Sequence, residues 1–169
     1  MIQASSNLGT MATDMAMRQI LPDATPLACE FPGNAEHGQF DRVYQDGDTI
    51  YIVESKGAGS EHGSRKELNG QQSQQGTPEY IASVIHQMGE KIEKAKADPR
   101  YGVDPVYTNH IRQLGKTLTA LENAQMSGKI VSLQASQRVD QNGGMVPVVE
   151  IKKFEDYSVK ADGSQNPKP

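Results

Sequence analysis

Apolar and polar positions alternate along two stretches that flank an Asp-Gly turn. "GQFDRVY" and "TIYIVESK" lie on either side of "QDGD". Alternation with a period of two is typical of strands, and Asp-Gly between two such runs is a strong hairpin signal. The pattern predicts a β-hairpin with its turn at Asp46-Gly47. A second, irregular hairpin is predicted from "KIVSLQASQRV" and "VPVVEIKKF" around "DQNGGM".

Apolar residues recur at helical spacing in two other segments. Thr77-Pro78-Glu79 is a favourable helix start, because Thr caps, Pro suits the first helical position and Glu favours the positive helix end. The two apolar stripes are Ile81, Val84, Ile85, Met88 and Ile92, followed by Ile111, Leu114, Leu118 and Leu121, which end near Gly128. These stripes predict two helices that bury one face. A shorter helix is predicted from Thr10 to Leu21, and a short strand near Leu27–Phe31.

The order of these elements fits a mixed α/β domain. The chain has 169 residues, enough for one hydrophobic core. We expect a single domain over residues 1–155, with its core from about residue 10, and a polar, frayed tail over 156–169. The stretch from Gly57 to Gly76 has no periodicity and predicts a loop of about twenty residues. Loops of that length in a compact domain are usually functional or disordered.

Composition narrows the chemistry. The single cysteine, Cys29, excludes an internal disulfide and a Cys-based zinc cage, and is expected to be a small buried hydrophobe. The net charge is −4, but residues 1–76 hold five Lys+Arg against ten Asp+Glu, whereas residues 77–169 hold twelve against eleven. Carboxylates gathered around a divalent cation would produce this imbalance, and so would a solvated acidic surface.

Two targeting classes are not expected. No apolar run approaches the ~20 residues needed to span a membrane. The start of the chain, "MIQASSNLGTMATDMAMRQILPD", lacks the basic region and apolar core of a secretory signal.

Charged residues at the end of the second hairpin strand raise a question of chemistry. With the turn at Asp46-Gly47, Asp41 lies opposite Ile52 and shares a face with Glu54 and Lys56. Asp41 and Glu54 are then diagonal neighbours, roughly 7–8 Å apart. Two carboxylates and an ammonium group on one sheet edge would suit a Mg²⁺ site beside a phosphate. The alternative is an exposed ion pair worth little, and an odd-length turn would move Asp41 to the opposite face.

The motifs around these residues resemble the PD-(D/E)xK nuclease superfamily, which has the restriction-endonuclease-like fold. "FD" precedes a strand, a hairpin turn follows, and "VESK" supplies the ExK. More narrowly, "FDRVY", "VESKG", a Gly-rich loop and "QQGT" before a helix resemble nuclease domains at the C-termini of bacterial polymorphic toxins. The resemblance spans Gly38 to about Met88. It implies a central mixed β-sheet flanked by helices.

The resemblance also implies roles for matching residues. Asp41 and Glu54 would be the metal carboxylates, for Mg²⁺ with Mn²⁺ as second candidate, and Lys56 the catalytic lysine. Gln74 or Gln75 would be the glutamine before the helix that contacts the substrate or orients the site.

Other positions are weaker candidates. Phe40 stands where the superfamily name has proline. The superfamily often adds a glutamate from the first helix, which has none here, so Glu30 or Glu36 is the expected substitute. Arg65 and Lys66, in the long loop, either clamp a phosphate backbone or are simply solvated.

The resulting expectation is a metal-dependent endonuclease that acts on DNA. RNA, including tRNA, stays open as substrate, and a non-enzymatic protein-binding module is the alternative of another class. The toxin resemblance implies an immunity protein as partner. It also implies secretion or delivery by a larger toxin or secretion system, with action in the cytoplasm of a target cell.

Overall fold

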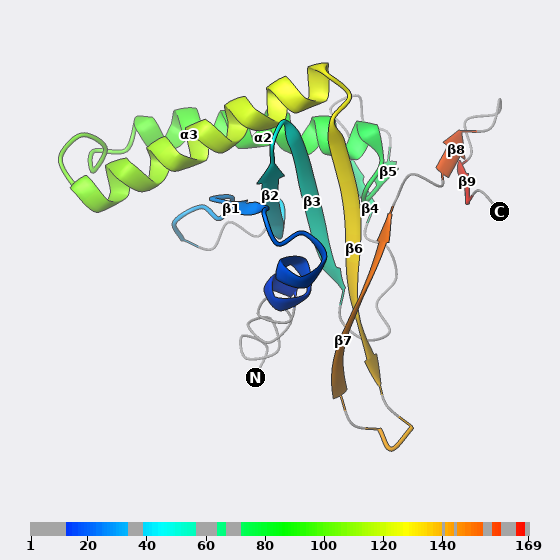
Figure 1. Ribbon diagram of the computed structural model, residues 1–169. Coiled ribbons are helices and arrows are strands. Elements are labelled where there is room, and N and C mark those ends of the chain that lie inside the picture. Colours follow the sequence, from blue (N-terminus) through cyan, green and yellow to red (C-terminus); the bar gives the residue numbers. More distant parts are fainter. Residues whose placement is uncertain are drawn as a thin grey trace.

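A five-stranded mixed sheet forms the centre of the computed structural model, which describes residues 13–33, 39–56, 64–66, 72–139, 141–143, 145–153, 157–159 and 165–167. Its strands, in spatial order, are β1 (Thr25–Leu27), β2 (Arg42–Asp46), β3 (Thr49–Lys56), β6 (Ile130–Val139) and β7 (Met145–Lys153). Neighbours are antiparallel except β3 and β6, which are parallel. Figure 1 shows the β6–β7 hairpin extending beyond the other strands.

Helices cover both faces of this sheet. Helices α2 (Pro78–Lys96) and α3 (Pro105–Met126) pack on one face, where Val43, Ile50 and Ile52 join the larger apolar cluster. The helix over residues 13–20 packs on the other face, where its Met17 joins a second cluster with Tyr44, Val53, Leu133 and Ala135. Alternate positions of β2 and β3 therefore serve two different cores. The predicted mixed α/β class is confirmed.

Helix α2 begins and packs as its sequence predicts. Thr77 accepts a hydrogen bond from the Tyr80 N–H, and proline occupies the start of the helix. The predicted stripe from Ile81 to Ile92 is buried. Helix α3 begins in the same way, because Asp104 accepts from the N–H groups of the second and third helical residues. Together the two helices bridge β3 and β6, since parallel neighbours require a long crossover.

The first hairpin forms where predicted, but its register differs by two residues. Asp46 pairs with Thr49, so Gly47 and Asp48 form the turn, and Val43 lies opposite Ile52. Gly47 has a φ of 59°. Type II′ hairpin turns favour glycine at this first central position, which explains why the turn lies one residue later than predicted. A shift of two residues preserves the face of every side chain.

Three other predictions are corrected. The first strand is at Thr25–Leu27, not Leu27–Phe31. The expected long loop contains the short antiparallel strands β4 (Ser64–Lys66) and β5 (Gln72–Gln74). The expected frayed tail contains β8 (Tyr157–Val159) and β9 (Gln165–Pro167). Strands of three residues, most of them polar, leave too little alternation to be recognised from the sequence.

The predicted N-terminal helix, the second hairpin and the burial of Cys29 are confirmed. Helical residues 13–20 fall within the predicted Thr10–Leu21, and the second hairpin is irregular, with a register shift between Ser136 and Arg138. Cys29 is buried. Among the helices of the described residues, none is both long and apolar enough to cross a membrane.

Candidate functional site

The candidate site lies where β2 begins and β3 ends. Asp41 immediately precedes β2, and Glu54 is two residues before the end of β3. Gln75 follows β5 and lies two residues before the Thr77 cap of α2. Three segments that are separate in sequence therefore contribute to one region.

Glu54 is a buried carboxylate on the face of the sheet that α2 and α3 cover. Its exposed fraction is 2%, and it follows the buried Ile50 and Ile52 at alternate positions of β3. The Gln75 side chain donates from Nε2 to Glu54 Oε2 over 3.1 Å. Buried charged groups require pairing, hydrogen bonds or metal coordination, because the loss of hydration is costly. The contact supplies one such hydrogen bond and fixes the orientation of the carboxylate.

Asp41 is anchored to the residue after Glu54. Its Oδ2 accepts a hydrogen bond from the Ser55 backbone N–H over 2.7 Å. The Arg42–Val53 pair ends the β2–β3 ladder, so Asp41 lies one residue outside the paired strands. The diagonal relationship predicted for Asp41 and Glu54 assumed a register that differs from the observed one by two residues. What brings the two residues together is the hydrogen bond to Ser55, which holds the Asp41 carboxylate beside the residue that follows Glu54.

These two carboxylates fit a hard divalent cation. Mg²⁺ is usually held by one or two carboxylates, with water and substrate phosphate completing the shell. Asp41 is exposed and Glu54 is buried, so one carboxylate faces solvent while the other is held within the fold. No cluster of three or more His, Cys, Asp or Glu suited to a metal occurs within the described part of the chain. A two-carboxylate site is what the described residues offer.

Some predicted residues are placed only by their backbone. Lys56 ends β3 and pairs with Ser136 of β6. In the β4–β5 hairpin, Ser64 pairs with Gln74, and Arg65 and Lys66 follow in β4. The structure describes the backbone of these residues but not the side chains of Lys56, Arg65, Lys66 and Gln74. Glu36 as a whole lies outside the described residues.

Glu30, the other expected third acid, has a different partner. Its Oε1 accepts from Arg42 Nη1 over 2.6 Å. Arg42 alternates with Val43 in β2 and therefore belongs to the sheet face opposite Glu54. Glu30 is thus paired with an arginine rather than grouped with Glu54. No local pattern indicates this contact, because an ion pair between residues 12 positions apart depends on how β1 and β2 lie together.

Three residues that the sequence did not point to as part of the site also contact Asp41. Ser55 holds Asp41 through its backbone, and a backbone donor carries no sequence signal. Arg42 donates from Nη1 to the Asp41 carbonyl over 3.0 Å, and the thiol of Cys29 donates to the same oxygen over 3.7 Å. Burial raises the pKa of Cys29 to about 11. The thiol therefore stays protonated near neutral pH, which excludes it as a nucleophile.

Comparison with known proteins identifies no relative: no family model, curated protein or solved structure matches this chain. The chemistry of the site is therefore inferred from its own residues and their geometry.

Proposed function

We propose that this protein is a metal-dependent endonuclease that hydrolyses phosphodiester bonds, with DNA as the favoured substrate. The observation that carries the proposal is the hydrogen bond from Gln75 to buried Glu54, beside an Asp41 carboxylate anchored on Ser55. Three residues that the nuclease motifs single out thus meet at one end of β3. Burial of a carboxylate is costly and is common at sites that use its charge.

Each residue of the site would have a distinct role. Asp41 and Glu54 would hold Mg²⁺ or Mn²⁺, and Gln75 would keep Glu54 in a ligating orientation. The bound cation would supply charge stabilisation for the scissile phosphate and a more acidic water. Lys56 would place an ammonium group near the phosphate and orient the attacking water.

The β4–β5 hairpin would extend the contact with substrate. Gln74, Arg65 and Lys66 belong to this hairpin, which directly precedes Gln75 and α2. Arginine and lysine bind phosphate oxygens and fix the register of a nucleic acid without reading its sequence. These residues would therefore bind the sugar-phosphate backbone of the nucleic acid, and base selection would fall to other parts of the chain.

The biological setting follows from the toxin resemblance. We propose that the protein acts as an antibacterial effector that is delivered by a larger toxin or secretion system into the cytoplasm of a target cell. An immunity protein would then block the site in the producing cell. RNA, including tRNA, is the second substrate class to be tested, because the same fold can carry other specificities.

The test is cleavage by purified protein. Plasmid DNA and total RNA are incubated separately with wild type in Mg²⁺, in Mn²⁺ and in EDTA. Glu54→Gln keeps the shape of the side chain and one acceptor oxygen for Gln75 but removes the charge, so it should abolish cleavage without unfolding the protein. Lys56→Ala should abolish cleavage as well. Circular dichroism verifies that each variant is folded.

Matched controls separate the site from general effects of charge. Glu122→Gln and Lys94→Ala change exposed residues of α3 and α2, and both variants should cleave like wild type. Cleavage of RNA without cleavage of DNA would support the same catalytic site, with RNA as its substrate in place of DNA. A folded wild-type protein that cleaves neither substrate would overturn the nuclease proposal in favour of a binding module.

A further inference from the structure

Arg42 directly follows Asp41 in the sequence, and its side chain contacts three groups. Its Nη1 donates to Glu30 Oε1 over 2.6 Å and to the Asp41 carbonyl over 3.0 Å, and its Nε lies 3.3 Å from Asp14 Oδ1. Only 20% of the side chain is exposed. The planar guanidinium can hold several acceptors at fixed angles, whereas an ammonium group is a point charge. Arg42 thus links its own peptide bond to two distant carboxylates.

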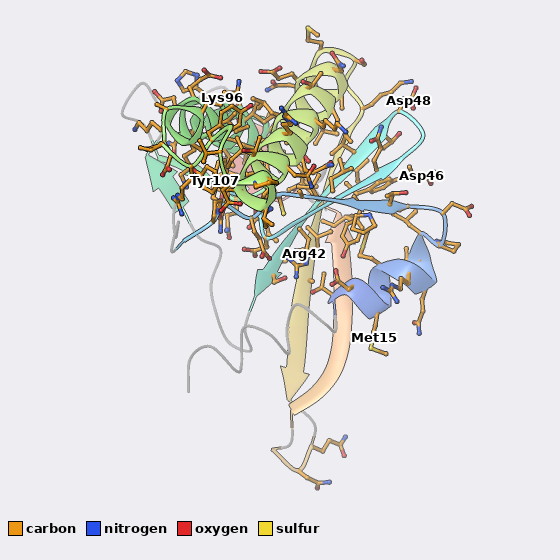
Figure 2. All side chains as sticks on the ribbon, turned by 90° about the vertical axis from the view of Figure 1, so that its left-hand side faces the viewer. Met15, Arg42, Asp46, Asp48, Lys96 and Tyr107 are labelled. Carbon is orange, nitrogen blue, oxygen red and sulfur yellow. The ribbon has the colours of Figure 1, made fainter. Side chains whose placement is uncertain are left out.

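Both carboxylates are held by other elements. Asp14 belongs to the helix of residues 13–20, which Figure 2 shows near the labelled Arg42, and it also accepts from the Tyr44 hydroxyl. The backbone carbonyl of Glu30 is hydrogen-bonded to His110 Nε2 of α3 over 2.7 Å. Arg42 is therefore braced from both faces of the sheet, by elements whose own packing is fixed by the two cores.

The same N-terminal helix contacts the second anchor of Asp41. Thr13 Oγ1 lies 3.3 Å from Ser55 Oγ. Ser55 is the residue whose N–H binds the Asp41 carboxylate. Asp41 is thus held at two points, its carbonyl by Arg42 and its carboxylate by Ser55. Two fixed points on one residue restrict both its backbone and the direction of its side chain.

We propose that Arg42 is a positioning residue for Asp41, which it holds in the orientation that a metal ligand needs, with Asp14 and Glu30 as its supports. This inference rests on the proposed function, because it assigns Arg42 to the same site. Groups that orient metal ligands without touching the metal affect metal affinity by about 10- to 100-fold. Arg42 contacts no reacting atom, so its substitution should change the affinity for Mg²⁺ and not the maximal rate of cleavage.

The test compares the Mg²⁺ concentration that gives half-maximal cleavage with the Mg²⁺ concentration that gives half of the Mg²⁺-dependent rise in Tm, which needs no catalysis. Arg42→Gln should raise both concentrations by about 10- to 100-fold. Arg42→Lys keeps the charge but loses the planar fork, and should give an intermediate value. Arg100→Gln is the matched control, because Arg100 also pairs with an aspartate, Asp98, but lies in the turn between α2 and α3. It should leave the Mg²⁺ dependence unchanged.

A merely structural role gives a different result. Loss of folded protein raises the half-maximal Mg²⁺ concentration only by the ratio of total to folded protein, so a variant that circular dichroism shows to be mostly folded leaves it nearly unchanged. Unchanged Mg²⁺ dependence in Arg42→Gln, beside an active wild type, would overturn this inference and leave the proposed function intact. An inactive wild type would overturn both. If Arg42→Gln does not fold, Asp14→Asn should shift the Mg²⁺ dependence in the same direction, and the absence of a shift would refute the role.

Discussion

Gln75 donates a hydrogen bond to Glu54 over 3.1 Å, although the two residues are 21 positions apart. The contact joins the segment before α2 to the end of β3, and it gives a buried carboxylate a fixed orientation. A glutamine that would otherwise be one of several in "QQSQQG" is thereby distinguished from its neighbours. Its role can be tested separately from that of the carboxylate.

Removal of the Gln75 side chain should reduce cleavage with little effect on the fold. Gln75→Ala leaves the Glu54 carboxylate but removes its orienting donor, and we expect a loss of about 10-fold or more in rate at limiting Mg²⁺. The free energy of unfolding should fall by about 1.5–3 kcal/mol, the usual worth of a hydrogen bond to a charged group. Initial rates and urea unfolding measure the two effects. Gln125→Ala, on an exposed position of α3, should change neither; equal rates for both variants would contradict the role of Gln75.

Mg²⁺ should stabilise the wild-type protein against heat. A ligand that binds only the folded state adds about 2.7 kcal/mol at a concentration 100 times its dissociation constant. Glu54→Gln should lose this Mg²⁺-dependent rise in Tm, because the amide is a poor substitute for a carboxylate ligand. Without metal the variant should melt at the same temperature or higher, since a buried charge is removed. Calorimetric scans with Mg²⁺ and with EDTA test this, and an equal Mg²⁺ effect on both proteins would exclude Glu54 as a ligand.

The packing of α2 against the sheet should dominate stability. Met88 is 0% exposed and lies in the larger apolar cluster, whereas Met126 is 81% exposed at the end of α3. Met88→Ala should lower the free energy of unfolding by about 2–5 kcal/mol, because it removes apolar contacts and leaves a cavity. Met126→Ala should change it by less than about 0.5 kcal/mol. Urea denaturation of the two variants provides the comparison, and similar midpoints would show that the packing described for α2 is wrong.

Cys29 should make stability decrease in alkaline solution. Burial raises its pKa from an ordinary value of 9.0 to about 11. A raised pKa in the folded state means that stability is complete below the unfolded value and is lost as pH rises through the folded value. The loss from this group should amount to roughly 2–3 kcal/mol between pH 9 and pH 11. The difference in unfolding free energy between wild type and Cys29→Ala should narrow over that window, and parallel pH curves would contradict the assignment.

The local sequence determined most of the secondary structure. The stripe from Ile81 to Ile92 has a helical period, and the Thr77-Pro78 start fixes where α2 begins, so neighbours along the chain suffice to define the element. "QDGD" between two alternating runs fixed the first hairpin in the same way. The face of each strand residue was also predicted, because a register shift of two residues leaves Val43, Ile50 and Ile52 on the same face.

The tertiary structure decided which polar side chains form hydrogen bonds and ion pairs with one another. Whether Glu54 meets Gln75, and whether Glu30 meets Arg42 instead of the carboxylate site, depends on how α2, β1 and the helix of residues 13–20 dock on the sheet. The parallel pairing of β3 with β6 joins segments about eighty residues apart, which no local period can encode. Hydrophobic burial on both faces of the sheet drives this docking. Which polar groups then come within hydrogen-bond distance is set by the packed arrangement as a whole, and not by any stretch of sequence on its own.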